Sequence, residues 1–214
     1  MKPLPNTTPA EGLSDPELVE RILGGDMRAL EALMRRHNRA LYRTARAILR
    51  DDAEAEDAVQ EAYLRAYRSL GSFRGESKLS TWLVRIAANE ALMRRRKKTR
   101  TAEVVPIDAA TEVSTEERGD SMLRRLLENR IDALPDGYRA VFVLRALEEL
   151  SVEETAAALG LPEATVRTRY FRARGLLRES LARDIDLGMQ DAFGFAGERC
   201  DRIVANVLKA VTGT

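Results

Sequence analysis

Apolar residues recur every three or four positions through most of the first hundred residues, which is the spacing of an amphipathic α-helix. The first stretch starts at residue 15 and breaks at Gly24-Gly25, after which Asp26 can cap a second stretch over 27–50. A third covers about 53–70 and is expected to end at Gly71, because glycine readily adopts the conformation that ends many helices. Its predicted buried face is Val59, Ala62, Tyr63, Ala66, Tyr67 and Leu70.

A fourth helix carrying Trp82 is expected after the polar loop at 71–80. His37 falls on the apolar stripe of the second helix and is interpreted as a packed core histidine with a hydrogen bond, not a catalytic one. No stretch alternates apolar and polar residues with the period of a β-strand. The pattern therefore predicts an all-α chain, with a disordered arm at 1–14 and a helical domain at 15–100.

The composition changes after Arg100. Residues 101–120 lack a helical stripe and carry six acidic residues against one arginine, which predicts a flexible acidic linker. Helical spacing returns over 121–183, a second small domain, and a tail at 184–214 adds a short amphipathic helix from about Ala196. We expect the tail helix to pack on the domain before it, with a partner-binding role for the tail and a redox role for Cys200 left open.

The second domain contains the signature of a helix-turn-helix. Ser151 and Glu154 are spaced as a capping box, in which each side chain accepts from the other residue's backbone NH. That helix is expected to stop at Gly160, and Pro162 suits the first turn of the next helix. In this arrangement the second helix enters the DNA major groove.

The second helix has the side chains for that task, although a solvated basic face is the plainer alternative. Its spacing lets Val166, Tyr170, Ala173 and Leu177 pack inward. Arginine grips guanine or phosphate, and threonine can bond to a base or touch a thymine methyl. We expect Arg167, Thr168 and Arg172 to face bases and Arg169 and Arg174 to face the backbone, while Phe171 either presses on a base methyl or packs. The candidate duplex-binding residues are Thr165, Arg167, Thr168, Arg169, Phe171, Arg172 and Arg174.

Three features of the first domain indicate further partners, although each has a plainer alternative: helix capping for the acidic residues, core packing for Phe73 and Trp82, and a solvated helix end for the basic run. Acidic residues with no compensating base among them open the third helix, which suggests a docking face for a basic partner; they are Asp51, Asp52, Glu54, Glu56, Asp57 and Glu61. The loop at 71–82 mixes aromatic, basic and hydroxyl residues, which can stack on and bond to unpaired bases. The run at 94–100 is basic at six of seven positions and could clamp phosphates.

Composition excludes several classes of protein. The formal net charge is only +1 although 32% of residues are charged, so the two signs are segregated along the chain. One cysteine and one histidine cannot form an intramolecular disulfide or a histidine-based metal site. We find no phosphate-cradling glycine loop and no nucleophile with its base, and no apolar run near the roughly 18 residues of a membrane span. We therefore expect a cytoplasmic protein that is not an enzyme, with no metal, no cofactor and no membrane insertion.

Taken together, these motifs resemble extracytoplasmic-function sigma factors, the small two-domain members of the sigma-70 family of bacterial RNA polymerase. Their second region is matched at 56–63, 73–77, 81–83 and 85–89, and their fourth region at 134–144, 151–156, 165–169 and 172–174. The resemblance covers about residues 15–183. No room is left for the third domain of larger relatives.

The resemblance implies a role for each surface. The acidic helix would bind the β′ clamp helices of core polymerase through Asp57, Gln60, Glu61 and Tyr63, and the β flap would be a further contact. The loop and the helix after it would melt the minus-ten element and hold a flipped base of the non-template strand. The residues concerned are Phe73, Arg74, Ser77, Lys78, Ser80, Thr81, Trp82, Arg85, Asn89, Arg94, Arg95 and Arg96. The second domain would read the minus-thirty-five duplex.

Two expectations qualify this picture. Leu79 and Val84 stand where the family often has aromatic residues, so the melting surface is expected to be less aromatic here. An anti-sigma factor is expected to hold both domains, which the linker would allow. The principal rival function is an autonomous helix-turn-helix regulator, which would bind duplex DNA without core polymerase.

Overall fold

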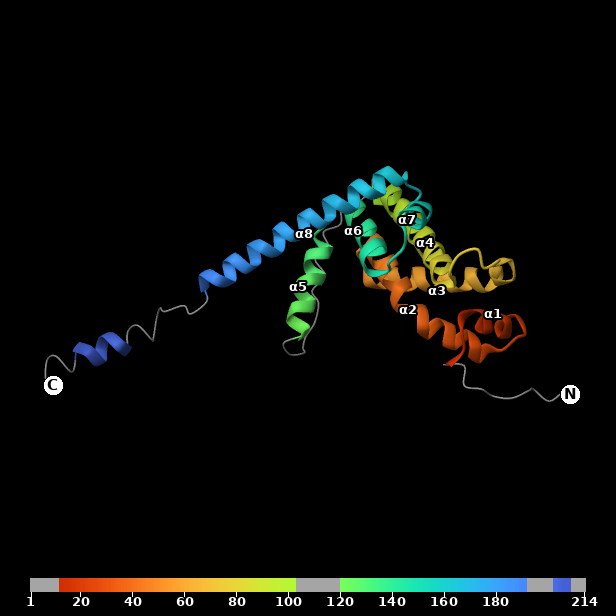
Figure 1. The fold of residues 1–214 in the computed structure, drawn as a ribbon, viewed down its shortest axis with the longest axis horizontal. Helices are drawn as coiled ribbons and strands as arrows, with labels where there is room; N and C mark the ends of the chain where they lie inside the picture. The colour runs from red at the N-terminus through yellow and green to blue at the C-terminus, as the bar shows by residue number, and fades with distance from the viewer. Residues whose placement is uncertain (1–11, 103–119, 192–201, 209–214) are drawn as a thin grey trace. The chain divides into compact units, whose positions relative to one another are not determined.

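The computed structural model describes residues 12–102, 120–191 and 202–208, and all regular secondary structure in these ranges is helical (Figure 1). The first half contains α1 (Asp15–Leu23), α2 (Met27–Leu49), α3 (Asp52–Ser69), the 3₁₀ turn η2 (Leu70–Ser72) and α4 (Leu79–Ala102). The second half contains α5 (Asp120–Asp132), α6 (Asp136–Phe142), the π-helical turn η3 (Val143–Leu147), α7 (Val152–Leu159) and α8 (Glu163–Asp191). The all-α prediction is confirmed over the described ranges.

Side-chain caps start the first three helices where the sequence places them. Ser14 and Glu17 form a capping box on α1, and Asp26 accepts from the backbone NH groups of Arg28 and Ala29 at 3.0 and 3.4 Å. The Asp51 carboxylate caps α3 by accepting from the Glu54 NH at 3.0 Å. Each such cap contributes about 1 kcal/mol, so the helix starts are set locally.

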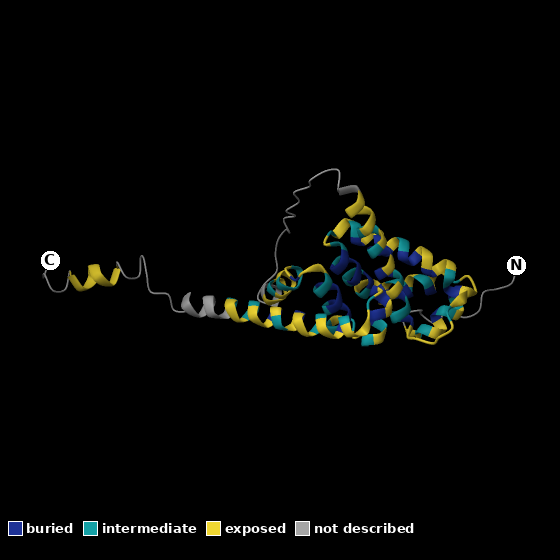
Figure 2. Ribbon diagram, turned by 90° about the horizontal axis from the view of Figure 1, so that it is seen from above, coloured by how far each residue is buried: buried dark blue, intermediate teal, exposed yellow. Residues whose placement is uncertain are grey.

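The core of the first half lies where α2, α3 and α4 pack against one another, with α1 across α2. Its buried residues include Leu33, Leu41, Ile48, Ala62 and Leu83. Buried stretches of the ribbon are dark blue in Figure 2. His37 is only 7% exposed, and its Nε2 lies 3.4 Å from Asp15 Oδ1, which confirms the packed core histidine.

Several helix ends and exposures differ from the sequence predictions. The α-helical part of α3 ends at Ser69, and Gly71 lies inside the 3₁₀ turn that follows. Tyr67 was expected to be buried and is 45% exposed, because it faces a groove described below. Leu79 already belongs to α4, so the predicted loop is shorter than 71–80.

A buried arginine joins the second half of the chain to the end of α2. Arg139 has no exposed surface, and its Nε donates to the carbonyl of Ala47 at 2.8 Å. Its Nη1 donates to the carbonyls of Asp132 and Leu134 at 3.1 and 2.8 Å, and its Nη2 donates to Asp136 at 2.7 Å. A buried cation is tolerated only when fully bonded, and here the bonding partners come from both halves.

The ends of the chain require corrections to the predicted boundaries. The chain divides into compact units at 1–175 and 176–214, and α8 continues to Asp191, so the expected boundary at 183 falls inside a helix. Residues 101, 102 and 120 are helical, whereas the rest of the predicted linker, Ala196 and Cys200 lie outside the described residues, as does the arm up to residue 11. Residues 202–208 form a short helix inside the predicted tail helix, and its packing on the preceding domain stays a prediction.

Candidate functional site

The helix-turn-helix is formed as the sequence predicts. The Ser151 hydroxyl accepts from the Glu154 NH at 3.1 Å, and the Glu154 carboxylate accepts from the Ser151 NH at 2.7 Å, which starts α7. Gly160 ends it at φ +63°, a left-handed conformation that favours glycine. The recognition helix α8 then begins at Glu163.

One side of α8 is buried and the opposite side carries the candidate reading residues. Val166, Ala173 and Leu177 are buried as predicted, and Tyr170 lies half-buried with the guanidinium groups of Arg145 and Arg174 5.4 and 5.8 Å from its ring centre. The burial of this side fixes the rotation of the helix, so the polar side must face outward.

The outward side shows which arginines are already paired. Phe171 is 80% exposed, so it does not pack within the protein and is available for a base. Arg167 is exposed but lies 2.7 Å from the Glu163 carboxylate and 3.9 Å from that of Glu153. Thr168 donates to the Ala164 carbonyl at 2.9 Å, so its hydroxyl oxygen is left as an acceptor.

A cleft of about 320 Å³ lies beside this face. It is lined by Tyr138 of α6 and by Ala164, Thr165, Thr168, Arg169 and Arg172 of α8. Tyr138 was not among the residues predicted from sequence, because nothing in the linear pattern relates the start of α6 to the face of α8.

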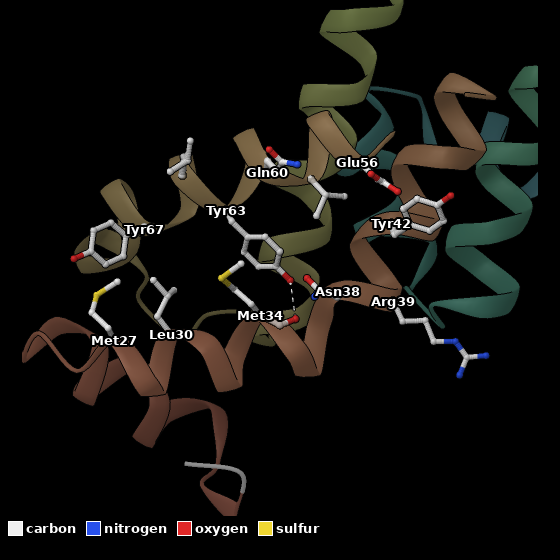
Figure 3. Close-up of a pocket in the computed structure, with 12 residues that line it drawn as sticks. Met27, Leu30, Met34, Asn38, Arg39, Tyr42, Glu56, Gln60, Tyr63 and Tyr67 are labelled. Atoms are coloured by element: carbon white, nitrogen blue, oxygen red, sulfur yellow. Dashed lines mark hydrogen bonds between the residues drawn. The ribbon is translucent and has the colours of Figure 1, made fainter. Parts of the chain in front are cut away.

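A larger, mostly apolar groove of about 880 Å³ runs between α2 and α3 (Figure 3). Gln60 and Tyr63 lie on its α3 side, as the predicted docking face requires, and the Tyr63 hydroxyl donates to the Met34 carbonyl at 3.2 Å. Burial raises the pKa of Tyr63, so the phenol stays a neutral donor. The lining residues are Met27, Leu30, Met34, Asn38, Arg39, Tyr42, Glu56, Val59, Gln60, Tyr63, Leu64 and Tyr67.

Sequence reasoning missed the α2 wall of this groove. Leu30 and Met34 were assigned to a core stripe, yet they line an open surface together with the exposed Met27. Helical spacing reports which side of a helix is apolar, and it does not report whether a neighbour covers that side. Asp57 and Glu61, two of the four predicted docking residues, are not among the lining residues.

The acidic cluster at the start of α3 is compensated from other helices, contrary to its isolated appearance in the sequence. Arg94 Nη1 lies 3.5 Å from Glu54 and 3.7 Å from Asp57, and its Nε lies 3.5 Å from the buried carboxylate of Glu90. Lys98 lies 3.9 Å from Asp51. Arg94 therefore forms ion pairs within the protein, whereas Arg96 is exposed.

Asp52 of the same cluster is bonded to α2. It accepts from the Tyr42 hydroxyl at 2.9 Å and from the Arg46 guanidinium. Burial, followed by the bond to Asp52, raises the pKa of Tyr42 to about 12. This carboxylate is thus used inside the protein and is less available to a partner.

Two of the predicted strand-melting residues, Phe73 and Trp82, are brought together at the start of α4. The rings of Phe73 and Trp82 lie 5.3 Å apart at 49°, both partly exposed. The neighbouring polar residues in the sequence are mostly exposed, namely Arg74, Ser77, Lys78, Arg85 and Asn89, and Ser80 is half-buried. Leu79 and Val84 are buried core residues, so their lack of aromatic rings does not bear on this surface and that expectation was wrong.

The start of α4 also contacts α7. The Thr81 hydroxyl donates to Glu154 at 3.1 Å, using the carboxylate oxygen that is not engaged in the capping box. Arg95, a candidate phosphate contact, lies 3.9 Å from Asp136 of α6. In this arrangement two predicted DNA-binding residues are engaged by the second half of the chain.

Comparison with known proteins identifies the family of the chain that carries these surfaces. The family model for Sigma-70 region 2 matches residues 33–101, and that for Sigma-70, region 4 matches residues 124–177. No helix within the described ranges has the length and apolar character needed to cross a bilayer.

Named relatives match over most of their length. The chain is 36% identical over 182 residues to the RNA polymerase sigma-H factor of Pseudomonas aeruginosa, covering 78% of this chain and 93% of the relative. It is 37% identical over 180 residues to the ECF RNA polymerase sigma-E factor of Escherichia coli, covering 77% and 93%. The sigma factor RpoE of Bartonella quintana, solved with the anti-sigma factor NepR, matches with a TM-score of 0.62 at 25% identity, covering 72% of this chain and 96% of that one. The chain therefore belongs to the extracytoplasmic-function RNA polymerase sigma factors and directs transcription initiation.

Proposed function

We propose that this sigma factor docks on core RNA polymerase through the α2–α3 groove, reads the minus-thirty-five duplex with α8, and opens the minus-ten element with the start of α4. The groove carries the proposal, because an autonomous DNA-binding regulator has no need of a large exposed apolar surface away from its reading helix. An α-helical partner can fill such a groove with side chains spaced three and four apart. The β′ clamp helices are the expected occupant.

The docking interface extends from the groove to the acidic side of α3. Asp57 and Glu61 lie one helical turn apart, and each follows a residue of the groove wall in the sequence, Glu56 and Gln60 respectively. Opposite charges at the rim of an interface accelerate association and fix its register. The partner helix is thus expected to be apolar on one side and basic beside α3.

The minus-ten function rests on the paired rings of Phe73 and Trp82. An aromatic face stacks on an unpaired base, whereas exposed Arg74, Lys78 and Arg85 can hold the backbone of the displaced strand. Arg96 and the exposed end of α4 continue this positive surface. Arg94 and Arg95 must exchange their present carboxylate partners for phosphates to take part.

Regulation by an anti-sigma factor also belongs to the proposal. The Bartonella relative is described in complex with such a protein, and this chain offers an apolar groove of the kind a regulatory helix can occupy. Purification from unstressed native cells should yield a small co-eluting protein. Transcription of a specialised, stress-type regulon is expected when that protein is released.

The protein is proposed to act in the cytoplasm, with no catalytic chemistry of its own. Its contribution is to bind, orient and open DNA, whereas the polymerase carries out nucleotide addition. Neither a metal nor a cofactor is part of this role.

Run-off transcription tests the proposal. The purified chain is added to bacterial core polymerase on a library of genomic promoter fragments, and promoter-specific transcripts should depend on both components. A chain that yields no specific transcript with core, and that binds a duplex site equally tightly without it, is an autonomous regulator. Mapping transcripts after overexpression then supplies the promoter sequence.

A further inference from the structure

The cleft between Tyr138 and the recognition helix has an unusual set of lining groups. It is formed by two helices, α6 and α8, and no carboxylate lines it. Tyr138 and Thr165, which carry hydroxyls, line it together with Arg169 and Arg172. Three kinds of hydrogen-bond donor therefore meet in one small space.

These donors have no recorded partner among the described residues. Within that part of the chain Arg169 and Arg172 form no ion pair, whereas Arg167 of the same helix is paired with Glu163 at 2.7 Å. The hydroxyls of Tyr138 and Thr165 likewise make no hydrogen bond there. Tyr138, Thr165 and Arg169 are half-buried and Arg172 is exposed. Unpaired donors gathered at one cleft favour an anion that accepts from several of them at once.

A glycine provides the space that one of these arginines occupies. A Cβ atom added at Gly137 would lie 2.9 Å from Nη1 and 3.1 Å from Cζ of Arg169. The guanidinium of Arg169 thus lies flat against the backbone of residue 137, at a distance that no side chain there would permit. Because the conflicting atoms are the far end of a flexible side chain, an alanine at 137 would displace the guanidinium and leave the fold intact.

We propose that this cleft is a binding site for a single phosphate of the promoter duplex, and that Gly137 and Tyr138 position it. The inference rests on the proposed reading role of α8. A phosphodiester suits the site because it is a compact anion with exposed oxygens, and phosphates contacted by arginine set the register of a recognition helix without reading sequence. Base edges are then left to the exposed side that carries Phe171.

The test uses the full chain assembled with core polymerase on the promoter identified by run-off transcription. Each phosphate of the minus-thirty-five element is replaced in turn by a neutral methylphosphonate, and binding of the holoenzyme is measured. In the wild type one such replacement should weaken binding about tenfold, the loss expected for a charge-assisted contact. In the Gly137→Ala and Arg169→Gln variants, the same methylphosphonate replacement should not weaken holoenzyme binding further. Replacements at the other phosphates should weaken binding as much as they do in the wild type.

Two further variants make the result specific. Tyr138→Phe removes only a hydroxyl and should reduce the penalty at that same phosphate. Gly175→Ala is the matched control, because it makes the same substitution in α8, the helix that carries Arg169, and its added Cβ would meet no atom within 4 Å. This variant should behave as wild type. Thermal melting of each variant verifies that the fold is retained.

The outcomes separate this inference from the proposed function. The inference is overturned if Gly137→Ala and Arg169→Gln keep the wild-type penalty at every phosphate, or if they weaken core binding instead. A wild type that directs no promoter-specific transcript overturns the proposed function alone. In that case the free chain still tests the site on any duplex, since loss of one phosphate contact should lower the slope of log affinity against log salt by about 0.9.

Discussion

Two open surfaces in the described part of the chain, the α2–α3 groove and the face of α8, are lined by side chains of opposite chemical character. The groove is walled mainly by apolar side chains, with polar groups at its edges, whereas the α8 face and its cleft are walled by arginines and hydroxyls. An apolar groove gains free energy by excluding water from a protein partner. A basic face gains it by releasing counterions from DNA. The contrast indicates that the two partners are recognised by different physical forces.

This comparison also explains why the two halves need a specific connection. Surfaces that bind different partners must be presented together, and the fully buried Arg139 links the halves by bonding to both. Substitutions that remove this link or alter one of the two surfaces therefore test the comparison.

Replacing Arg139 by Met should destabilise the protein by about 3 kcal/mol, because it leaves buried carbonyl groups of both halves without a donor. Urea unfolding of wild type and variant measures the difference. Arg124→Met, at an arginine exposed on α5, is the control and should be close to neutral. Equal stability of Arg139→Met and wild type would show that this link is not needed to hold the halves together.

Leu64→Asp should weaken binding to core polymerase by roughly 30-fold, or about 2 kcal/mol, the loss expected at an interface hot spot. Leu64 is 51% exposed in the groove wall, so the change should leave the fold unaffected. Leu123→Asp introduces the same charge at a leucine that is 57% exposed on α5. Titration of labelled sigma factor with core should distinguish the two, and a similar loss in both would place docking elsewhere.

Arg172→Ala should reduce promoter-specific transcription about tenfold or more by removing a base or phosphate contact, with core binding unchanged. Arg167→Ala should act in the same direction, but less strongly, since that guanidinium must first leave its contacts with Glu163 and Glu153. Run-off assays on promoters altered at single minus-thirty-five positions provide the readout. If both variants transcribe as wild type, α8 is not the reading helix.

The smallest effect concerns pH. Burial, opposed by nearby Asp15, lowers the pKa of His37 in the folded protein. In the unfolded chain the pKa of this histidine is about 6.5, so below that pH the unfolded chain binds more protons than the folded protein. Stability from this group is therefore complete above that pH and falls as the pH is lowered through it. Unfolding free energies at pH 7 and pH 5 should differ more for wild type than for His37→Gln, and an identical difference would contradict this reading.

Much of the fold was predictable because its signals are local. The Asp26 cap, the Ser151 and Glu154 capping box and the stop at Gly160 each lie within a few residues, and each is confirmed. The buried side of α8 followed from spacing alone. The arginines of its outward side were identified by residue type, although which of them touch bases stays a prediction.

What escaped prediction depends on contacts between segments distant in the sequence. The acidic start of α3 looked uncompensated because Arg94 is about forty residues away, and the groove was hidden because Leu30 and Met34 look like core residues. Gly137 lies in α6 and makes room for Arg169, which is more than thirty residues away in the sequence. Spacing identifies the sides of helices, and only packing shows which sides remain open.

The hydrogen bond between Thr81 and Glu154 adds a free-energy cost to promoter opening. If Thr81 binds the melted strand as proposed, this bond must first be broken, so the apparent affinity for the strand is reduced by the fraction of molecules in which α7 is still attached to α4. Core polymerase that separates these helices would remove that reduction in advance. The same carboxylate would then act as a thermodynamic coupling between docking on the polymerase and opening of the DNA.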